Sequence, residues 1–226
     1  MTRYRLACAW ALSVIVGMAL SACEKERQPG PAELALVTQA LDHELNAPAE
    51  QLRGNLKRAA SDGRIYAEEL TITGPTATTP VDWWIWGKGL IKLGGTDSYA
   101  RGYFVLTPQG EALVHGPEAH WLASTFQGAP QVVCSGNGGF ESCRVRGSAK
   151  VKLSPEGAAL FDSAAIPPQP FTADLQYGPS GWSVDELKIT NGVETWGMVR
   201  TALFGDDDAI AKARYAWGAQ MNRQVR

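Results

Sequence analysis

Two of the three histidines, His115 and His120, lie in the segment HGPEAH and are separated by four residues. Imidazole nitrogens in such a loop can bind a metal ion, and Glu118 between them offers a carboxylate as a third ligand. Loop histidines serve more often as polar contacts, and no HExxH helix accompanies this pair. We therefore treat His115 and His120 as weak metal candidates, and we expect neither a metal site nor a cofactor.

The chain carries none of the strong catalytic signatures. It lacks the Gly-x-Ser-x-Gly elbow of α/β-hydrolases and the Gly-x-x-x-x-Gly-Lys loop that holds phosphates. No pair of carboxylates for sugar hydrolysis can be singled out from 23 acidic residues. We therefore favour a non-catalytic protein that binds a protein or envelope partner. A cell-wall or small-ester hydrolase is the alternative, and a carrier of a small apolar ligand is the second alternative.

The N-terminal segment has the pattern of an export signal. Two arginines precede the uncharged run 6–20, which is shorter than the roughly 20 apolar residues that span a membrane. The run ends in Leu-Ser-Ala-Cys at residues 20–23, which resembles the lipobox of bacterial lipoproteins. The resemblance implies that residues 1–22 are a signal peptide, that the Cys23 thiol receives a diacylglyceryl group, and that its new amine is acylated, with palmitate as the expected chain.

The resemblance also carries an expectation about location. Lipoproteins of Gram-negative bacteria that lack Asp after the modified cysteine usually go to the outer membrane, and Glu24 stands at that place. We therefore expect the periplasmic face of the outer membrane, with residues 23–30 as the lipidated cysteine and a tether. The segment 24–30 reaches at most about 25 Å when extended, so the folded body lies close to the bilayer.

The charge of the chain agrees with attachment by lipid. Removing residues 1–22 takes away two arginines and moves the formal net charge from −2 to −4. Such a surface is attracted neither to nucleic acid nor to anionic lipid. The expected partners are therefore the membrane, through the acyl chains, and an envelope protein.

The two remaining cysteines, Cys134 and Cys143, enclose the segment SGNGGFES. In an oxidising periplasm they are expected to form a disulfide. A redox role is disfavoured because the spacing is not Cys-x-x-Cys.

Residues 31–226 predict a single α+β domain. Apolar residues recur at helical spacing over 31–45, and Asn46-Ala47-Pro48 predicts a break before a second helix to about residue 60. A mainly antiparallel sheet follows, with the disulfide joining two strands of one hairpin and a second hairpin over 170–190. Two C-terminal helices complete the fold. The strands are expected at 64–73, 100–107, 120–126, 130–135, 142–154, 170–177 and 181–190.

Tryptophan is the most unusual feature of this domain, because three of eight tryptophans lie within 83–86. A helix over 81–93 places several of these side chains on one face, and a strand pair is the alternative. Burial in the core is the commoner fate of such residues. If Trp83 or Trp84 is exposed, then Trp83, Trp84 and Trp86 form a candidate surface for the bilayer or a partner.

One internal similarity links two junctions. Residues 103–113 (YFVLTPQGEAL) and 150–160 (KVKLSPEGAAL) share five of eleven residues. In each, a strand ends at a helix N-cap, Thr107 or Ser154, that is followed by proline. The similarity can come from duplication of one unit, or from a favourable strand–helix junction that occurs twice. The similarity does not extend upstream, which favours the second explanation.

Overall fold

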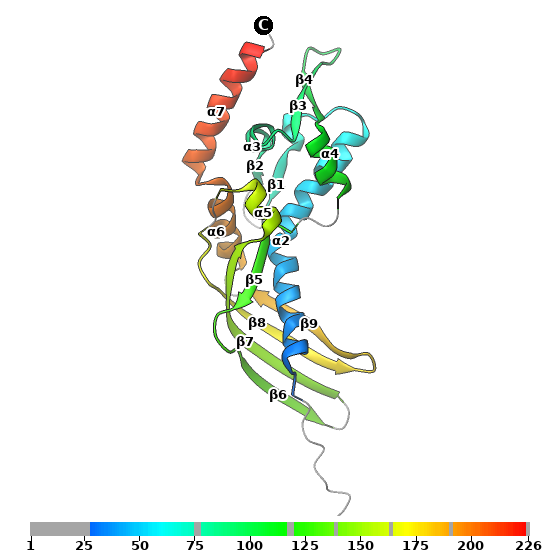
Figure 1. The fold of residues 1–226 in the computed structure, drawn as a ribbon, viewed down its shortest axis with the longest axis vertical. Helices are drawn as coiled ribbons and strands as arrows, with labels where there is room; N and C mark the ends of the chain where they lie inside the picture. The colour runs from blue at the N-terminus through cyan, green and yellow to red at the C-terminus, as the bar shows by residue number, and fades with distance from the viewer. Residues whose placement is uncertain are drawn as a thin grey trace, which may run out of the picture.

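The computed structural model describes residues 28–224, apart from 75–77, 117–119, 138–139, 163–164 and 190–191. The predicted signal peptide, Cys23 and Glu118 lie outside these residues. The described chain forms an elongated α+β fold (Figure 1), which confirms the predicted class. Helix α2 runs along the long axis. A five-stranded sheet lies beside its beginning, and smaller helices and hairpins surround its end.

Helix α2 spans Pro31–Ser61 without interruption, so the predicted helix pair is wrong. Its start is set by Pro31 and by Glu33, whose carboxylate accepts the Gly30 N–H at 2.8 Å. Pro48 lies inside the helix, where it removes a hydrogen bond but does not end it. The helix continues because buried residues on both sides of Pro48, such as Leu45 and Leu52, hold its two halves against the rest of the fold.

The main sheet is antiparallel and contains the order β5-β7-β8-β9, with β6 pairing to β7 beyond the end of β5. The long central strand β7 thus has two short strands along one side. Both predicted hairpins are present, one formed by β6 and β7 and the other by β8 and β9. In the first of them Cys134 lies directly opposite Cys143. The strands are β5 (Leu122–Phe126), β6 (Gln131–Asn137), β7 (Phe140–Leu153), β8 (Gln169–Gly178) and β9 (Gly181–Ile189).

Helix α2 covers the outer edge of β5 with side chains. The Asn46 amide donates to the Leu122 carbonyl at 2.8 Å and accepts the Leu122 N–H at 2.9 Å. One turn earlier, the Asp42 carboxylate accepts the Ser124 N–H at 2.6 Å. Asn46 is only 3% exposed, so these bonds satisfy both a buried side chain and the backbone of an edge strand.

The other half of the molecule contains short elements. The predicted strand at 64–73 was too long, because only Ile65 bridges to Phe104 before a 3₁₀ turn and strand β1. The segment 81–93 is divided between helix α3 and strand β3. The expected single helix and the alternative strand pair were therefore each only partly right. The bounds are η1 (Ala67–Glu69), β1 (Thr71–Thr73), β2 (Thr78–Pro80), α3 (Asp82–Gly87), β3 (Ile91–Thr96), β4 (Gly102–Leu106), α4 (Pro108–His115) and α5 (Pro155–Leu160).

The two similar sequence segments form the same junction. Thr107 and Ser154 both cap a helix through their hydroxyls, which accept the N–H groups of Gly110 and Gly157. The N–H of each cap residue also donates across the sheet, from Thr107 to Leu90 and from Ser154 to Trp121. A Cβ atom on Gly110 or Gly157 would lie 2.0 Å from that same carbonyl oxygen. Glycine is therefore required at both places by the close approach of helix and strand.

Helices α6 (Gly192–Phe204) and α7 (Asp207–Gln224) complete the chain, as the sequence predicts. They are joined at Gly205, which has a φ of 87°, and the Asp206 carboxylate accepts the Ala209 N–H at 2.8 Å. Arg214 attaches α7 to α3 by two hydrogen bonds to the fully buried carboxylate of Asp82.

Two apolar clusters share α2. The lower cluster lies between the start of α2 and the sheet, and it contains Leu41, Val145 and Phe171. The upper cluster is built around the rings of Trp84, Trp121, Phe161 and Phe204, whose centroids lie 4.9–6.5 Å apart. Ile189 of β9 packs against both clusters, so the two halves form a connected core.

Candidate functional site

The tryptophans of α3 belong to the core. Trp84 is 5% exposed and stacks on Phe161, so it cannot form the candidate partner surface proposed from the sequence. Trp83 and Trp86 are half-buried and pack against the upper cluster. The buried Nε1 of Trp83 has no acceptor among the described residues. Apolar packing rather than recognition therefore explains the three tryptophans.

The two candidate histidines have separate contacts, and His115 ends helix α4, so the expectation that both lie in a loop was wrong for His115. The His115 Nε2 atom lies 3.1 Å from the Glu111 carboxylate one turn earlier in α4, and both side chains are exposed. The His120 backbone accepts the Ser154 hydroxyl and donates to Glu156. Within the described ranges, no three histidine, cysteine or carboxylate side chains are grouped as metal ligands.

The predicted disulfide between Cys134 and Cys143 is present and joins β6 to β7. Cys143 is 1% exposed and belongs to the lower cluster. The bond faces the apolar side of the sheet, which fits a structural role.

The opposite side of the sheet is polar and is hollowed over β6, β7 and β8. Arg144 of β7 binds the Asp174 carboxylate through two hydrogen bonds of 2.7 and 2.9 Å. These bonds lower the pKa of Asp174, while they and the charge of Asp174 raise the pKa of Arg144. Asp185, which also lines the hollow, accepts from Gln176 at 2.8 Å. An ionised, Arg-bound Asp174 is unsuited to be the general acid of a hydrolase.

The turn between β3 and β4 presents an aromatic side chain to solvent. Tyr99 is 82% exposed and lies two residues after Asp97. The Asp97 carboxylate accepts the N–H groups of Tyr99 and Arg101, the Arg101 Nε–H and the Tyr66 hydroxyl, at 2.9–3.1 Å. Burial opposes ionisation of Asp97, but these hydrogen bonds outweigh it and lower the pKa of the carboxyl. These hydrogen bonds tie the backbone of the turn to Asp97, while the Tyr99 side chain extends into solvent.

Cation–π contacts extend this network. The Arg101 guanidinium lies 4.5 Å from the centroid of the Tyr66 ring, and that of Arg64 lies 5.1 Å from the Tyr103 ring. Tyr103 lies over Gly94, where a Cβ atom would approach its ring to 2.5 Å. These contacts connect the hairpin to the segment after α2 and stiffen the surface around Tyr99.

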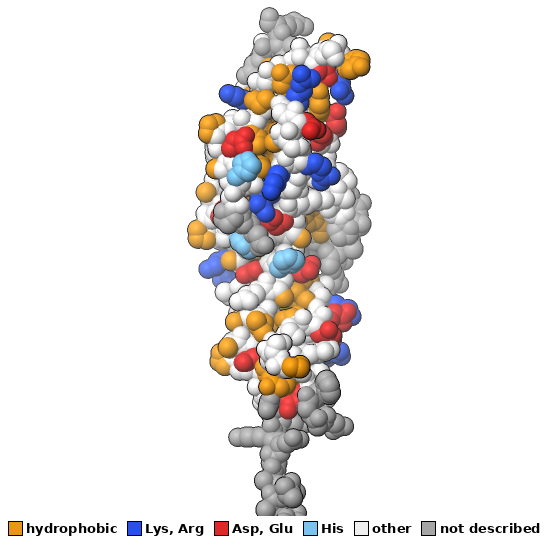
Figure 2. Space-filling model, turned by 90° about the vertical axis from the view of Figure 1, so that its right-hand side faces the viewer, with side chains coloured by type: hydrophobic (Ala, Val, Ile, Leu, Met, Phe, Trp, Pro, Cys, Tyr) orange, Lys and Arg blue, Asp and Glu red, His pale blue; other side chains and the backbone are white. Residues whose placement is uncertain are grey.

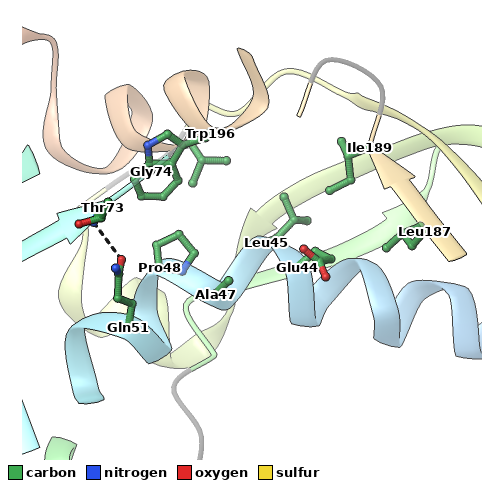
Figure 3. A pocket seen from close by; sticks show the side chains of 11 residues that line it. Glu44, Leu45, Ala47, Pro48, Gln51, Thr73, Gly74, Leu187, Ile189 and Trp196 are labelled. Atoms are coloured by element: carbon green, nitrogen blue, oxygen red, sulfur yellow. Dashed lines mark hydrogen bonds between the residues drawn. The ribbon is translucent and has the colours of Figure 1, made fainter. Parts of the chain in front are cut away.

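A cavity of about 390 Å³ lies where the two halves of the molecule meet. Figure 3 shows its walls, with α2 on one side and β9 and α6 on the other. Gly74 closes one end against the Trp196 ring, since a Cβ atom there would lie 1.5 Å from the indole nitrogen. Gln51 holds β1 to α2 by accepting the Thr73 N–H at 2.9 Å. The lining residues are Glu44, Leu45, Ala47, Pro48, Gln51, Thr73, Gly74, Leu187, Ile189, Trp196 and Val199.

The sequence did not reveal the cavity or the rigid Tyr99 turn. Asp97 and Arg101, four residues apart with a serine-tyrosine pair between them, were the one signal for the turn. The cavity is formed by residues up to 155 positions apart, and no local pattern marks it.

The face of the described residues that Figure 2 shows has no large field of one sign. Figure 2 shows acidic and basic side chains interspersed over one face of the molecule. Among the described residues, no helix has the length and the apolar run that crossing a bilayer requires.

Comparisons with known proteins do not assign this chain to a family. No family model, curated protein or solved structure matches it.

Proposed function

We propose that the protein is a non-catalytic lipoprotein of the bacterial outer membrane that binds an envelope protein through the turn containing Tyr99. The sequence at residues 20–23 supports lipidation at Cys23, and the disulfide is suited to an oxidising compartment. The polar hollow of the sheet offers a salt bridge rather than a catalytic pair, which disfavours the hydrolase alternative.

The observation that carries the proposal is the position of the turn. Helix α2 begins at one end of the elongated molecule, and the β3–β4 turn lies at the other end (Figure 1). A tether that enters α2 therefore leaves Tyr99 at the end farthest from a lipid anchor. Tyrosine supplies much of the binding energy at protein interfaces, and a preformed turn loses little entropy on binding.

The anchor is tested by metabolic labelling of cells with radioactive palmitate. The expected result is a labelled protein in the outer-membrane fraction, and an unlabelled, unprocessed protein when Cys23→Ser is introduced. Cys8→Ser is the matched control, because it removes a thiol inside the leader and is expected to leave labelling unchanged. Absence of label from the unaltered chain would contradict lipidation.

The partner surface is tested by placing a photo-crosslinking amino acid at position 99 of the full chain in intact cells. We expect one reproducible adduct with an envelope protein from position 99 and none from position 133 in the sheet, where the native valine is 59% exposed. With a crosslinker at an adjacent position, Tyr99→Ala abolishes the adduct. Tyr215→Ala, which removes an equally exposed tyrosine from α7, leaves it intact. Equal adducts from positions 99 and 133 would overturn the proposed surface.

A further inference from the structure

The cavity between the two halves of the molecule has an apolar body. Leu45 and Pro48 of α2, Leu187 and Ile189 of β9, and Trp196 of α6 form its walls. Its volume of about 390 Å³ is within the range of small-molecule sites. At roughly 30 Å³ per water molecule, it has room for about a dozen waters or a ligand with a similar number of heavy atoms.

Glu44 is the one charged residue among the described residues that line the cavity. The Glu44 side chain is exposed, lines the same cavity and adds a negative charge. Figure 3 shows Glu44 on α2 next to Leu45 and across from β9. This carboxylate favours a ligand with a positive charge and hydrogen-bond donors.

We propose that this cavity binds a small amphipathic amine with a single alkyl chain. The chain lies against Leu45, Ile189 and Trp196, and the ammonium group donates to the carboxylate of Glu44. Repulsion from Glu44 weakens the binding of an alkyl sulfate, and an alcohol lacks the positive charge. This binding site does not depend on lipidation or on the Tyr99 surface.

The test uses the full chain in phosphatidylcholine vesicles and a decylamine that carries a diazirine in its alkyl chain. After irradiation, adducts are mapped by peptide mass spectrometry. We expect them on segments 44–51 and 187–199, which line the cavity. Competition by unlabelled compounds separates the contributions of the head group. Decylamine competes best, decyltrimethylammonium and decanol compete less, and decyl sulfate competes least.

Two variants at exposed positions test the site without disturbing the core. Ala47→Trp fills the cavity from its rim and is expected to abolish the adducts. Glu44→Gln is expected to weaken competition by decylamine about threefold to fivefold, the size of an exposed charge pair. Asp62→Asn, which removes the same charge just beyond the far end of α2, is the control and leaves binding unchanged. Thermal unfolding verifies that all three variants fold.

The proposal is overturned if adducts spread evenly over the surface, or if all four compounds compete equally, since both results describe simple partition into the vesicle. It is also overturned if folded Ala47→Trp protein is labelled at 44–51 and 187–199 as strongly as the unaltered chain.

Discussion

Single atoms decide whether the two helix–strand junctions can form. A Cβ atom at position 110 or 157 would collide with a backbone carbonyl that itself holds the adjacent helix cap. Gly110→Ala and Gly157→Ala should therefore each lower the free energy of unfolding by about 1–3 kcal/mol. Gly54→Ala is the control, because nothing lies within 4 Å of its Cβ and alanine favours a helix. Urea unfolding followed by circular dichroism measures the free energy of unfolding of all three variants. A Gly157→Ala protein as stable as the unaltered chain would contradict this reasoning.

A single carboxyl group, that of Asp97, should also determine how the Tyr99 turn responds to acid. Because the folded protein lowers the pKa of Asp97, its ionised form stabilises the fold. This contribution is complete above the ordinary carboxyl pKa of about 3.9, and it is lost as the pH falls through the lowered pKa. Melting temperatures measured from pH 6 down to pH 2 should fall less steeply for Asp97→Asn than for the unaltered chain. Tyr66→Phe removes one of the hydrogen bonds and should give an intermediate slope. Identical slopes for all three proteins would show that the network does not favour the charged form.

Helix α7 contacts the rest of the fold mainly at α3. Its outer residues are exposed, and Arg214 binds a carboxylate with no access to solvent. Arg214→Leu should cost about 3 kcal/mol, because it leaves Asp82 buried without its cation. Changing both residues, as Asp82→Leu with Arg214→Leu, should recover part of that loss. A double-mutant cycle in urea measures the coupling, and additive effects would show that the pair does not interact.

Elements with local signals were predictable from the sequence. Thr107-Pro108 and Ser154-Pro155 marked helix starts, and the turn at 178–181 marked the hairpin of β8 and β9. Pro48 misled because tertiary burial of Leu45 and Leu52 outweighs the loss of one helical bond. The Trp-rich segment was divided because Gly89 has a φ of 69°, which ends α3 before β3 begins. The Asp82–Arg214 pair joins residues 132 positions apart, beyond the reach of any periodicity.

At the scale of the whole molecule, one helix connects the two apolar clusters. Leu41 of α2 lies in the lower cluster, and Leu56 lies in the upper cluster with Trp84 and Trp121. Leu41→Ala and Leu56→Ala should each cost about 2–5 kcal/mol. Because α2 and Ile189 couple the clusters, the protein should unfold in one transition. In each variant, tryptophan fluorescence and far-ultraviolet circular dichroism should therefore report the same shift of the urea midpoint. Separate transitions, with fluorescence unaffected by Leu41→Ala, would show two independently folding halves.

The bonds from Asn46 and Asp42 to β5 also bear on how copies of this protein behave when crowded on a surface. Sheets grow into fibrils when an incoming chain finds free N–H and C=O groups along a border strand. On β5 the N–H groups of Leu122 and Ser124 and the carbonyl of Leu122 are already bonded to side chains of α2. Amyloid-like stacking from that side would first require α2 to be pulled away, which would also break open the core.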